Sequence, residues 1–286
     1  MRFSFVFTTQ GVTHAALKLH NGRAKDHEGL CTEFVAYGIK TLAPILATLF
    51  NEAVCHGFPK AWTLNTITPI HKAGDPMDPG NYRTIMIGHV MSKIYASVLD
   101  GEVSARAEVQ GLRAAGQAGF RTDHSTYDHI FTLRGIIEEA RHRRQRVYCC
   151  FVDFRKAFDT VPRARLIRRL QELGYDSEVV WAVVALYERV TGQVRIGTSW
   201  TPEITSTIGV KQGCPLSPTL FGLYIDELET IIRTLGGAGC SLAEAVIQIL
   251  LYANDVVLLS SSATGLQQHL DGLQVFCDSS PTTLLR

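Results

Sequence analysis

The sequence lacks the features of a secreted or membrane-spanning protein. It has no Asn-x-Ser/Thr acceptor for glycosylation, and its apolar start, residues 1–7, is too short for a bilayer span and has no cleavage-site pattern. The seven cysteines show no paired metal-binding spacing, and an odd number without a secretory signal favours reduced thiols. We therefore expect an intracellular protein without a membrane partner.

An excess of one charge is also missing, because 28 Lys and Arg residues balance 27 Asp and Glu residues. The basic residues are nevertheless concentrated in residues 141–169, which hold ten of them and only two acids. Such a block suits a phosphate-bearing partner. The alternative is that these residues end a helix and form a solvated helix face, and the sequence leaves both interpretations open.

Hydrophobic residues make up 46% of the 286 residues, enough for a large core, and no internal repeat is present. Residues 147–154 form an apolar run that includes Cys149 and Cys150 and is broken only by Asp153, which predicts a buried central strand. Apolar spacing and turn residues predict helices over 30–56, 90–110, 163–173, 177–190 and 220–235, with another from 124 onward. Strands are expected over 64–70, 246–251 and 256–260, with a hairpin over 193–208 that turns at Thr201-Pro202. This pattern predicts an α+β fold with helices packed on an antiparallel sheet.

Two acidic positions lie where strands end or turn. Asp153 is in the apolar strand, and Asn254-Asp255 separate two apolar runs. Carboxylates so placed, far apart in sequence, are what a two-metal phosphoryl-transfer site needs. Taken singly, Asp153 could be a strand-end acid in solvent or paired with Arg155, and Asp255 could be a turn former.

Three stretches, taken together and in this order, are a more specific signal than either acidic position alone. They are Phe-Val-Asp-Phe-Arg-Lys-Ala-Phe-Asp at 151–159, Gln-Gly-Cys-Pro-Leu-Ser-Pro at 212–218, and Leu-Tyr-Ala-Asn-Asp-Val at 251–256. They resemble the palm of reverse transcriptases from LINE-type (non-LTR) retrotransposons. The resemblance implies an RNA-directed DNA polymerase with right-hand fingers and palm, whose antiparallel palm sheet is packed by helices. It divides the chain into a helical lead-in (1–57), a fingers-like region (58–146), a palm-like region with the metal site (147–277) and an unmatched tail (278–286).

The resemblance also implies roles for single residues. Asp153 and Asp255 would be the catalytic metal ligands of two Mg²⁺ ions, and Asn254 occupies the position of a further family aspartate. Nucleotide-binding residues would be Arg83 and Lys72 at the triphosphate, Phe158 at the sugar, and Gln212 and Gly213 at the nucleotide and template pocket. Arg121, Arg155 and Lys156 would contact nucleic acid. Phe158 could instead serve core packing, and Arg121 could be an ordinary arginine of a surface loop.

The chain departs from the family pattern at Asn254, since an amide lacks the charge of the expected aspartate. Losing one metal-binding carboxylate would reduce the rate by on the order of 10³-fold or more. The tail after residue 277 does not match, so we expect the thumb to be missing. An RNA template, a DNA primer and dNTPs are the implied partners, and a nuclear site of action is expected. The alternatives are a catalytically dead remnant that binds nucleic acid weakly, and a palm-like cyclase, which the Gln212 and Asn81-Tyr-Arg83 motifs disfavour.

Overall fold

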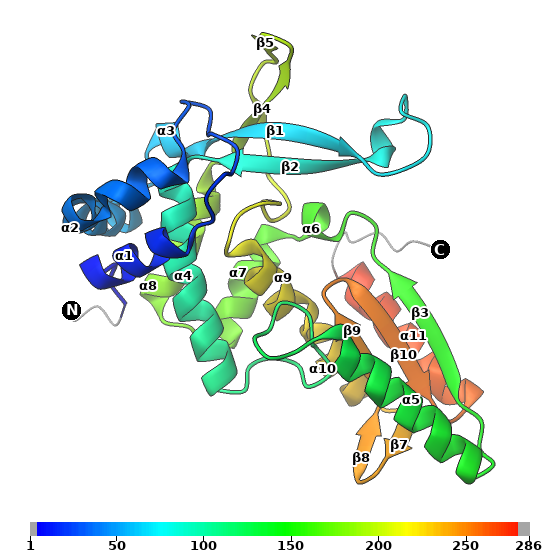
Figure 1. Cartoon of the computed structure of the whole chain (residues 1–286). Helices are drawn as coiled ribbons and strands as arrows, with labels where there is room; N and C mark the ends of the chain where they lie inside the picture. Colours follow the sequence, from blue (N-terminus) through cyan, green and yellow to red (C-terminus); the bar gives the residue numbers. More distant parts are fainter. Residues whose placement is uncertain (1–4, 280–286) are drawn as a thin grey trace. The chain divides into compact units, whose positions relative to one another are not determined.

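The computed structural model describes residues 5–279. The chain divides into two compact units, each built from two separate stretches (Figure 1). Unit 1 comprises residues 1–106 and 166–217, and unit 2 comprises residues 107–165 and 218–286. Three helices have residues in both units: α4 (Val90–Val109), α7 (Arg163–Glu172) and α9 (Ser217–Ile225).

Unit 1 contains the helices of the first part of the chain and a mixed sheet. Its remaining elements are α1 (Thr9–Lys18), α2 (Thr32–His56), α3 (Lys60–Thr63), β1 (Leu64–His71), η1 (Pro79–Asn81), β2 (Tyr82–Gly88), α8 (Ser177–Glu188), β4 (Thr191–Ile196), β5 (Ser199–Trp200) and β6 (Ile204–Thr205). The sheet has the order β2-β1-β4-β5, with β6 also paired to β4. β1 and β2 form a long antiparallel hairpin with η1 near its tip (Figure 1).

An aromatic cluster forms the core of unit 1. Phe7 stacks on Tyr95 with ring centroids 4.5 Å apart, and Phe50 contacts Tyr95 edge-on. Tyr95 is fully buried, and its hydroxyl donates a 3.0 Å hydrogen bond to the carbonyl of Ala182 on α8. This bond satisfies the polar end of a large ring in an apolar interior.

The long helix α2 confirms the helix predicted over 30–56, although apolar residues of the predicted pattern such as Phe34 and Tyr37 are exposed. Its buried residues recur at helical spacing: Thr32, Val35, Ile39, Ala43, Leu46, Ala47, Phe50 and Ala53. Gly57 ends it with φ 92°, a conformation that glycine adopts readily. Among the described residues, α2 is the one helix long and apolar enough to cross a membrane, but a core helix of a globular protein meets the same criterion.

Unit 2 contains a three-stranded antiparallel sheet, a small hairpin and packed helices. Its elements are α5 (Thr126–His142), β3 (Tyr148–Asp153), α6 (Ala157–Thr160), α10 (Glu227–Leu235), β7 (Cys240–Leu242), β8 (Ala245–Ile247), β9 (Ile249–Tyr252), β10 (Asp255–Ser260) and α11 (Ala263–Asp278). The sheet order is β3-β10-β9, and α11 packs against β10 and β3 (Figure 1). Ile136, Cys240, Leu250 and Leu259 form a buried cluster.

The structure corrects three sequence predictions. β3 is an edge strand with alternating exposure, not a buried central strand, so Cys149, Phe151 and Asp153 are exposed. The hairpin after β4 turns at residues 197–198, where Gly197 has φ 62°, rather than at Thr201-Pro202. The predicted helix 220–235 is two helices, α9 and α10, which are divided at Asp226.

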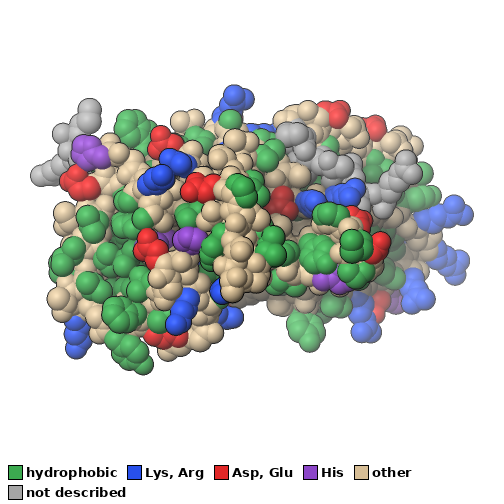
Figure 2. Space-filling view, turned by 90° about the horizontal axis from the view of Figure 1, so that it is seen from above, with side chains coloured by type: hydrophobic (Ala, Val, Ile, Leu, Met, Phe, Trp, Pro, Cys, Tyr) green, Lys and Arg blue, Asp and Glu red, His purple; other side chains and the backbone are tan. Residues whose placement is uncertain are grey.

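The basic block 141–169 does not form one uniform surface. Arg141–Arg146, in the last turn of α5 and just after it, are exposed, whereas Arg165 pairs with Glu227 at 3.0 Å. On the face shown in Figure 2, lysine and arginine side chains lie among acidic and hydrophobic ones at several separate places. The residues that end α5 therefore fit the helix-terminus interpretation as well as the phosphate-binding one.

Candidate functional site

Asp153 and Asp255 lie opposite each other at the ends of two neighbouring strands. They are register partners in the antiparallel pair of β3 and β10, so two carboxylates 102 positions apart meet at one edge of the sheet. The loss of part of its hydration raises the pKa of Asp255 above the ordinary value, and the charge of Asp153 adds to this effect. Both residues are exposed, which corrects the expectation of a buried Asp153.

Asn254 completes this corner. It lies in the two-residue turn between β9 and β10, where the preceding Ala253 has φ 57°. Its Nδ2 donates a 3.0 Å hydrogen bond to Asp153 Oδ1. The amide therefore satisfies one of the carboxylate oxygens that the predicted metal site would use.

The corner offers hard oxygen donors, which fit a divalent cation. Reverse transcriptases are nucleotidyltransferases that generally need one. Two carboxylates of like charge at one edge are stabilised by such an ion, but the third position contributes only a neutral amide. Within residues 5–279, no group of three or more His, Cys, Asp or Glu side chains is arranged to hold a metal. The donor set thus fits a divalent cation with one carboxylate fewer than the resemblance implies.

Phe158 lies just beyond β3, in the short helix α6. Its ring stacks on Phe221 with centroids 4.7 Å apart and contacts Phe120 edge-on at 6.0 Å. The side chain is half-buried, so packing accounts for part of its role, and its contact with the sugar stays a prediction. Arg155 and Lys156, which precede α6, are exposed, and Lys156 has φ 50° at the start of the helix.

The predicted nucleotide-binding residues Gln212 and Gly213 lie beside β2 in unit 1. The Gln212 carbonyl accepts a 2.8 Å hydrogen bond from the Met86 amide. Gly213 has φ 107°, and a Cβ there would lie only 2.7 Å from the Met86 carbonyl oxygen. Only glycine allows this close approach of two backbones. The structure therefore explains why the segment needs this residue type.

Arg83 and Lys72 lie at the distal end of the β1–β2 hairpin. Arg83 is paired with Ile70, and the Lys72 amide bonds to the Asn81 carbonyl. Both side chains are exposed. These residues belong to unit 1 and the two aspartates to unit 2, so their joint action on one nucleotide stays a prediction.

The side chain of Arg121 forms hydrogen bonds with other residues of unit 2. Its guanidinium forms two hydrogen bonds with the carboxylate of Glu108, at 2.9 and 2.7 Å, and donates to the carbonyls of Ala114 and Gln117. The hydrogen bonds from Arg121 hold the pKa of Glu108 below its ordinary value. Arg121 thus fixes the loop 111–121, and its contact with template phosphate stays a prediction.

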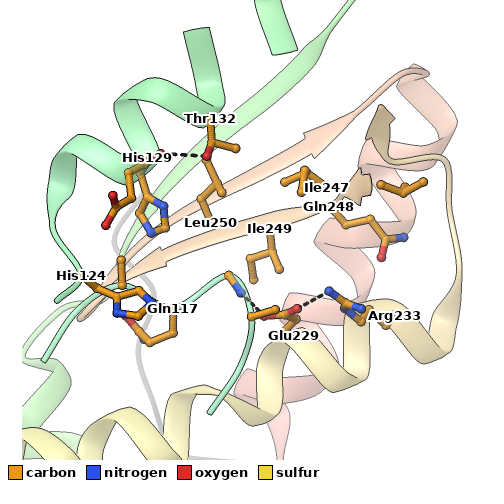
Figure 3. A pocket seen from close by; sticks show the side chains of 15 residues that line it. Gln117, His124, His129, Thr132, Glu229, Arg233, Ile247, Gln248, Ile249 and Leu250 are labelled. Atoms are coloured by element: carbon orange, nitrogen blue, oxygen red, sulfur yellow. Dashed lines mark hydrogen bonds and ion pairs between the residues drawn. The ribbon is translucent and has the colours of Figure 1, made fainter. Parts of the chain in front are cut away.

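Sequence reasoning missed the residues that hold this loop against the sheet. Arg113 forms a buried ion pair with Asp226 at 2.7 Å, and the side chain of Gln117 reaches the turn at Ala253. A pocket of about 170 Å³ beside β9 is lined by Gln117, His129 and Glu229 among others (Figure 3). The available signal was the pair Gly116 and Gly119 around Gln117, since closely spaced glycines indicate a close backbone approach.

Comparisons with known proteins agree with this arrangement. The family model "Reverse transcriptase (RNA-dependent DNA polymerase)" matches residues 70–284. The chain is 32% identical over 205 residues to the "Retrovirus-related Pol polyprotein from type-1 retrotransposable element R2" of Popillia japonica, covering 71% of the chain and 28% of that protein. It is 26% identical over 242 residues to the "RNA-directed DNA polymerase from mobile element jockey" of Drosophila melanogaster, covering 82% of the chain and 26% of that protein. The chain therefore spans about a quarter of the length of these relatives.

A solved structure shows the same fold. Telomerase from Candida albicans, in a complex with a fragment of telomeric RNA, matches with a TM-score of 0.54 and 12% identity. The match covers 80% of the chain and 43% of the telomerase chain.

Proposed function

The chain belongs to the reverse transcriptase (RNA-dependent DNA polymerase) family, and from this premise we propose that it copies RNA into DNA as the polymerase domain of a non-LTR retrotransposon. Its substrates would be an RNA template, a DNA primer and dNTPs, and its site of action the nucleus. The observation that carries the proposal is the pairing of Asp153 with Asp255 at the edge of the β3–β10 sheet.

In the proposed reaction, the primer 3′-hydroxyl oxygen forms a bond to the α-phosphorus of a dNTP. The bond from that phosphorus to the bridging oxygen breaks, pyrophosphate leaves, and the hydroxyl proton passes to solvent. Two Mg²⁺ ions, when bound, would lower the pKa of the hydroxyl and neutralise charge on the leaving group. Asp153 and Asp255 would hold these ions through their carboxylate oxygens.

The other residues would bind and orient the substrates. Arg83 and Lys72 would contact the triphosphate, because a guanidinium and an ammonium both pair with phosphate oxygens. Phe158 would border the sugar, and Gln212 with Gly213 would border the base pair. Arg121, Arg155 and Lys156 would contact the nucleic-acid backbone through charge.

Asn254 would weaken this reaction without altering the fold. The corner carries one negative charge fewer than a site with three carboxylates, and Asn254 Nδ2 is bonded to Asp153 Oδ1. A cation entering the corner must displace that hydrogen bond. We expect a rate lower by on the order of 10³-fold than in a chain with aspartate at this position.

The same contact favours a second candidate function. If the bond from Asn254 to Asp153 prevents cation binding altogether, the chain is a catalytically dead retroelement remnant. It would then bind nucleic acid weakly, through exposed basic residues such as Arg155 and Lys156. Binding of this kind falls steeply as salt is raised.

Primer extension on an RNA template with Mg²⁺ and dNTPs tests the proposal. The natural chain is compared with Asn254→Asp and with the matched double variant Asp153→Asn/Asn254→Asp. We expect Asn254→Asp to extend the primer on the order of 10³-fold faster than the natural chain, and the double variant to be inactive. Equal rates for the natural chain and Asn254→Asp would show that position 254 is not a metal ligand. Extension by Asn254→Asp with none by the natural chain, which still binds RNA in a salt-sensitive way, would favour the second candidate.

A further inference from the structure

The segment 116–119 lies along the outer edge of β9, the strand that leads into the metal-site turn. The Leu251 amide donates to the Gly116 carbonyl at 2.7 Å, and the Ala118 amide donates to the Leu251 carbonyl at 2.9 Å. Gln117 and Leu251 form a parallel bridge. The segment thus covers backbone groups that an edge strand would otherwise leave unpaired.

The side chain of Gln117 continues this contact to the turn itself. Its Oε1 accepts hydrogen bonds from the Gly119 amide at 2.7 Å and from the Ala253 amide at 3.1 Å. Gln117 is only 1% exposed, so these bonds form away from water. Ala253 has φ 57°, which costs energy for a residue with a Cβ, and it directly precedes Asn254. The bond therefore supports a strained residue next to the metal-site corner.

Two glycines make this arrangement possible. A Cβ at Gly119 would lie 2.1 Å from the Ala253 nitrogen, and a Cβ at Gly116 would lie 2.7 Å from the Ile249 carbonyl oxygen. Neither approach leaves room for a side chain. The segment accordingly rests directly, backbone against backbone, on β9 and on the turn.

The other end of the segment is fixed to helix α10. The Gly116 amide donates to Glu229 at 2.8 Å, and Glu229 also pairs with Arg233 (Figure 3). Arg113 pairs with Asp226, which directly precedes α10. The segment is therefore anchored on a helix at one end and contacts the turn at the other.

We propose that Gln117 is a positioning residue that holds the β9–β10 turn, and with it Asn254 and Asp255, in the geometry that binds a divalent cation. This inference rests on the proposed function only in taking the corner as the metal site. Among the described residues, Gln117 forms no hydrogen bond with Asp153 or Asp255. It would therefore act through the backbone of Ala253.

The first test measures amide hydrogen exchange in the natural chain. Because Gln117 Oε1 accepts from it, the Ala253 amide should exchange about as slowly as the Leu251 amide of β9. Exchange of Ala253 at the rate of an unstructured peptide would overturn the proposal without any variant.

The second test uses Gln117→Met, which keeps the length of the side chain but removes the acceptor oxygen. Exchange of the Ala253 amide should become about tenfold faster, the change expected for one lost hydrogen bond. Mn²⁺ binding, followed by electron paramagnetic resonance in an Asn254→Asp background, should weaken several-fold. The matched control Gln171→Met changes an exposed glutamine of α7 and should alter neither quantity.

These readouts separate this proposal from the polymerase proposal. One outcome is that Asn254→Asp fails to extend a primer while Gln117→Met still accelerates Ala253 exchange and weakens Mn²⁺ binding. In that case the positioning role of Gln117 stands and the proposed polymerase activity is wrong. If extension occurs, Gln117→Met should lower kcat and leave the KM for dNTP unchanged, because it alters the metal corner and not the nucleotide contacts. Unchanged Ala253 exchange and Mn²⁺ affinity in Gln117→Met would overturn the proposal.

Discussion

The amide nitrogen of Asn254 lies 3.0 Å from Asp153 Oδ1 and donates a hydrogen bond to it. In Asn254→Asp this donor is replaced by a third carboxylate beside Asp153 and Asp255. Without a divalent cation, the variant should therefore be less stable than the natural chain, by about 1 kcal/mol at this exposed corner. Mg²⁺ should then raise the melting temperature of the variant more than that of the natural chain, because ions that bind only the folded state stabilise it.

Thermal denaturation with EDTA and with added Mg²⁺ measures both effects. Asn21→Asp, at an exposed position of unit 1, is a control for the change of residue type. An Mg²⁺ response that is the same in the natural chain and in Asn254→Asp would contradict the metal assignment.

The buried ion pair of Arg113 and Asp226 should be essential to the stability of unit 2. Both side chains are nearly inaccessible, and they meet at 2.7 Å. Burial raises the pKa of Asp226, while the charge of Arg113 and its hydrogen bond oppose that rise. Arg113→Met would leave a buried carboxylate without its partner and should cost about 3–5 kcal/mol of unfolding free energy.

The double variant Arg113→Met/Asp226→Leu should be more stable than Arg113→Met, because neither charge remains buried. Arg134→Met, which removes an exposed pair with Glu138, should cost less than about 1 kcal/mol. Urea denaturation of the four proteins checks these values. A double variant no more stable than Arg113→Met would show that the pair is not the source of the loss.

Phe158 should contribute to packing whether or not it contacts a sugar. Its stack on Phe221 is close to parallel, at 11°. Phe158→Ala should cost about 2 kcal/mol, less than the 3–5 kcal/mol of a fully buried phenylalanine, because the side chain is half-buried. Phe131→Ala, at a residue that is 78% exposed, is the control and should cost much less.

A role of Phe158 in sugar selection has a separate readout. In an Asn254→Asp background that extends primers, Phe158→Ala should increase the use of ribonucleotides relative to deoxynucleotides. A loss of stability with unchanged selectivity would leave packing as its only role.

His269 should make the stability of the fold depend on pH. The residue is fully buried in α11, and burial lowers its pKa below the ordinary 6.5, partly opposed by a hydrogen bond with the Leu259 backbone. Below pH 6.5 the unfolded chain binds a proton that the folded chain resists, so stability should fall as the pH falls through this range.

His269→Leu should flatten this pH dependence, whereas His14→Leu, at an exposed position of α1, should leave it unchanged. Denaturant unfolding from pH 7.5 to pH 5 measures the slope. A natural chain whose stability rises as the pH falls from 6.5 would contradict the sign of the effect.

Helices with strong periodicity were predicted well from the sequence. Contacts between residues far apart in the sequence were predicted poorly. The α2 pattern extended over 25 residues, so its helix was clear. The run around Asp153 looked buried because each of its residues is apolar, but exposure depends on which strands pair. β3 has β10 on one side only, so Phe151 is exposed. Likewise, no local pattern shows that Asp226 meets Arg113, 113 positions earlier.

The sequence predicted the residues of the corner, whose role as a metal site stays a prediction, but not the segment that supports them. Motifs identified Asp153, Asn254 and Asp255, and the structure places them at one corner. Gln117 was not among the site residues that the sequence suggested. Its proposed role depends on a hydrogen bond from the amide of Ala253, 136 positions later in the sequence, which periodicity cannot reveal.

Titration of Mn²⁺ by electron paramagnetic resonance tests the central claim most directly, because it measures the corner without requiring turnover. The natural chain, Asn254→Asp and Asp153→Asn/Asn254→Asp are compared under the same conditions. We predict weak binding to the natural chain, binding at least tenfold tighter to Asn254→Asp, and loss of that gain in the double variant. Equal affinity in all three proteins would contradict the assignment of Asp153, Asn254 and Asp255 as a metal site with one carboxylate replaced.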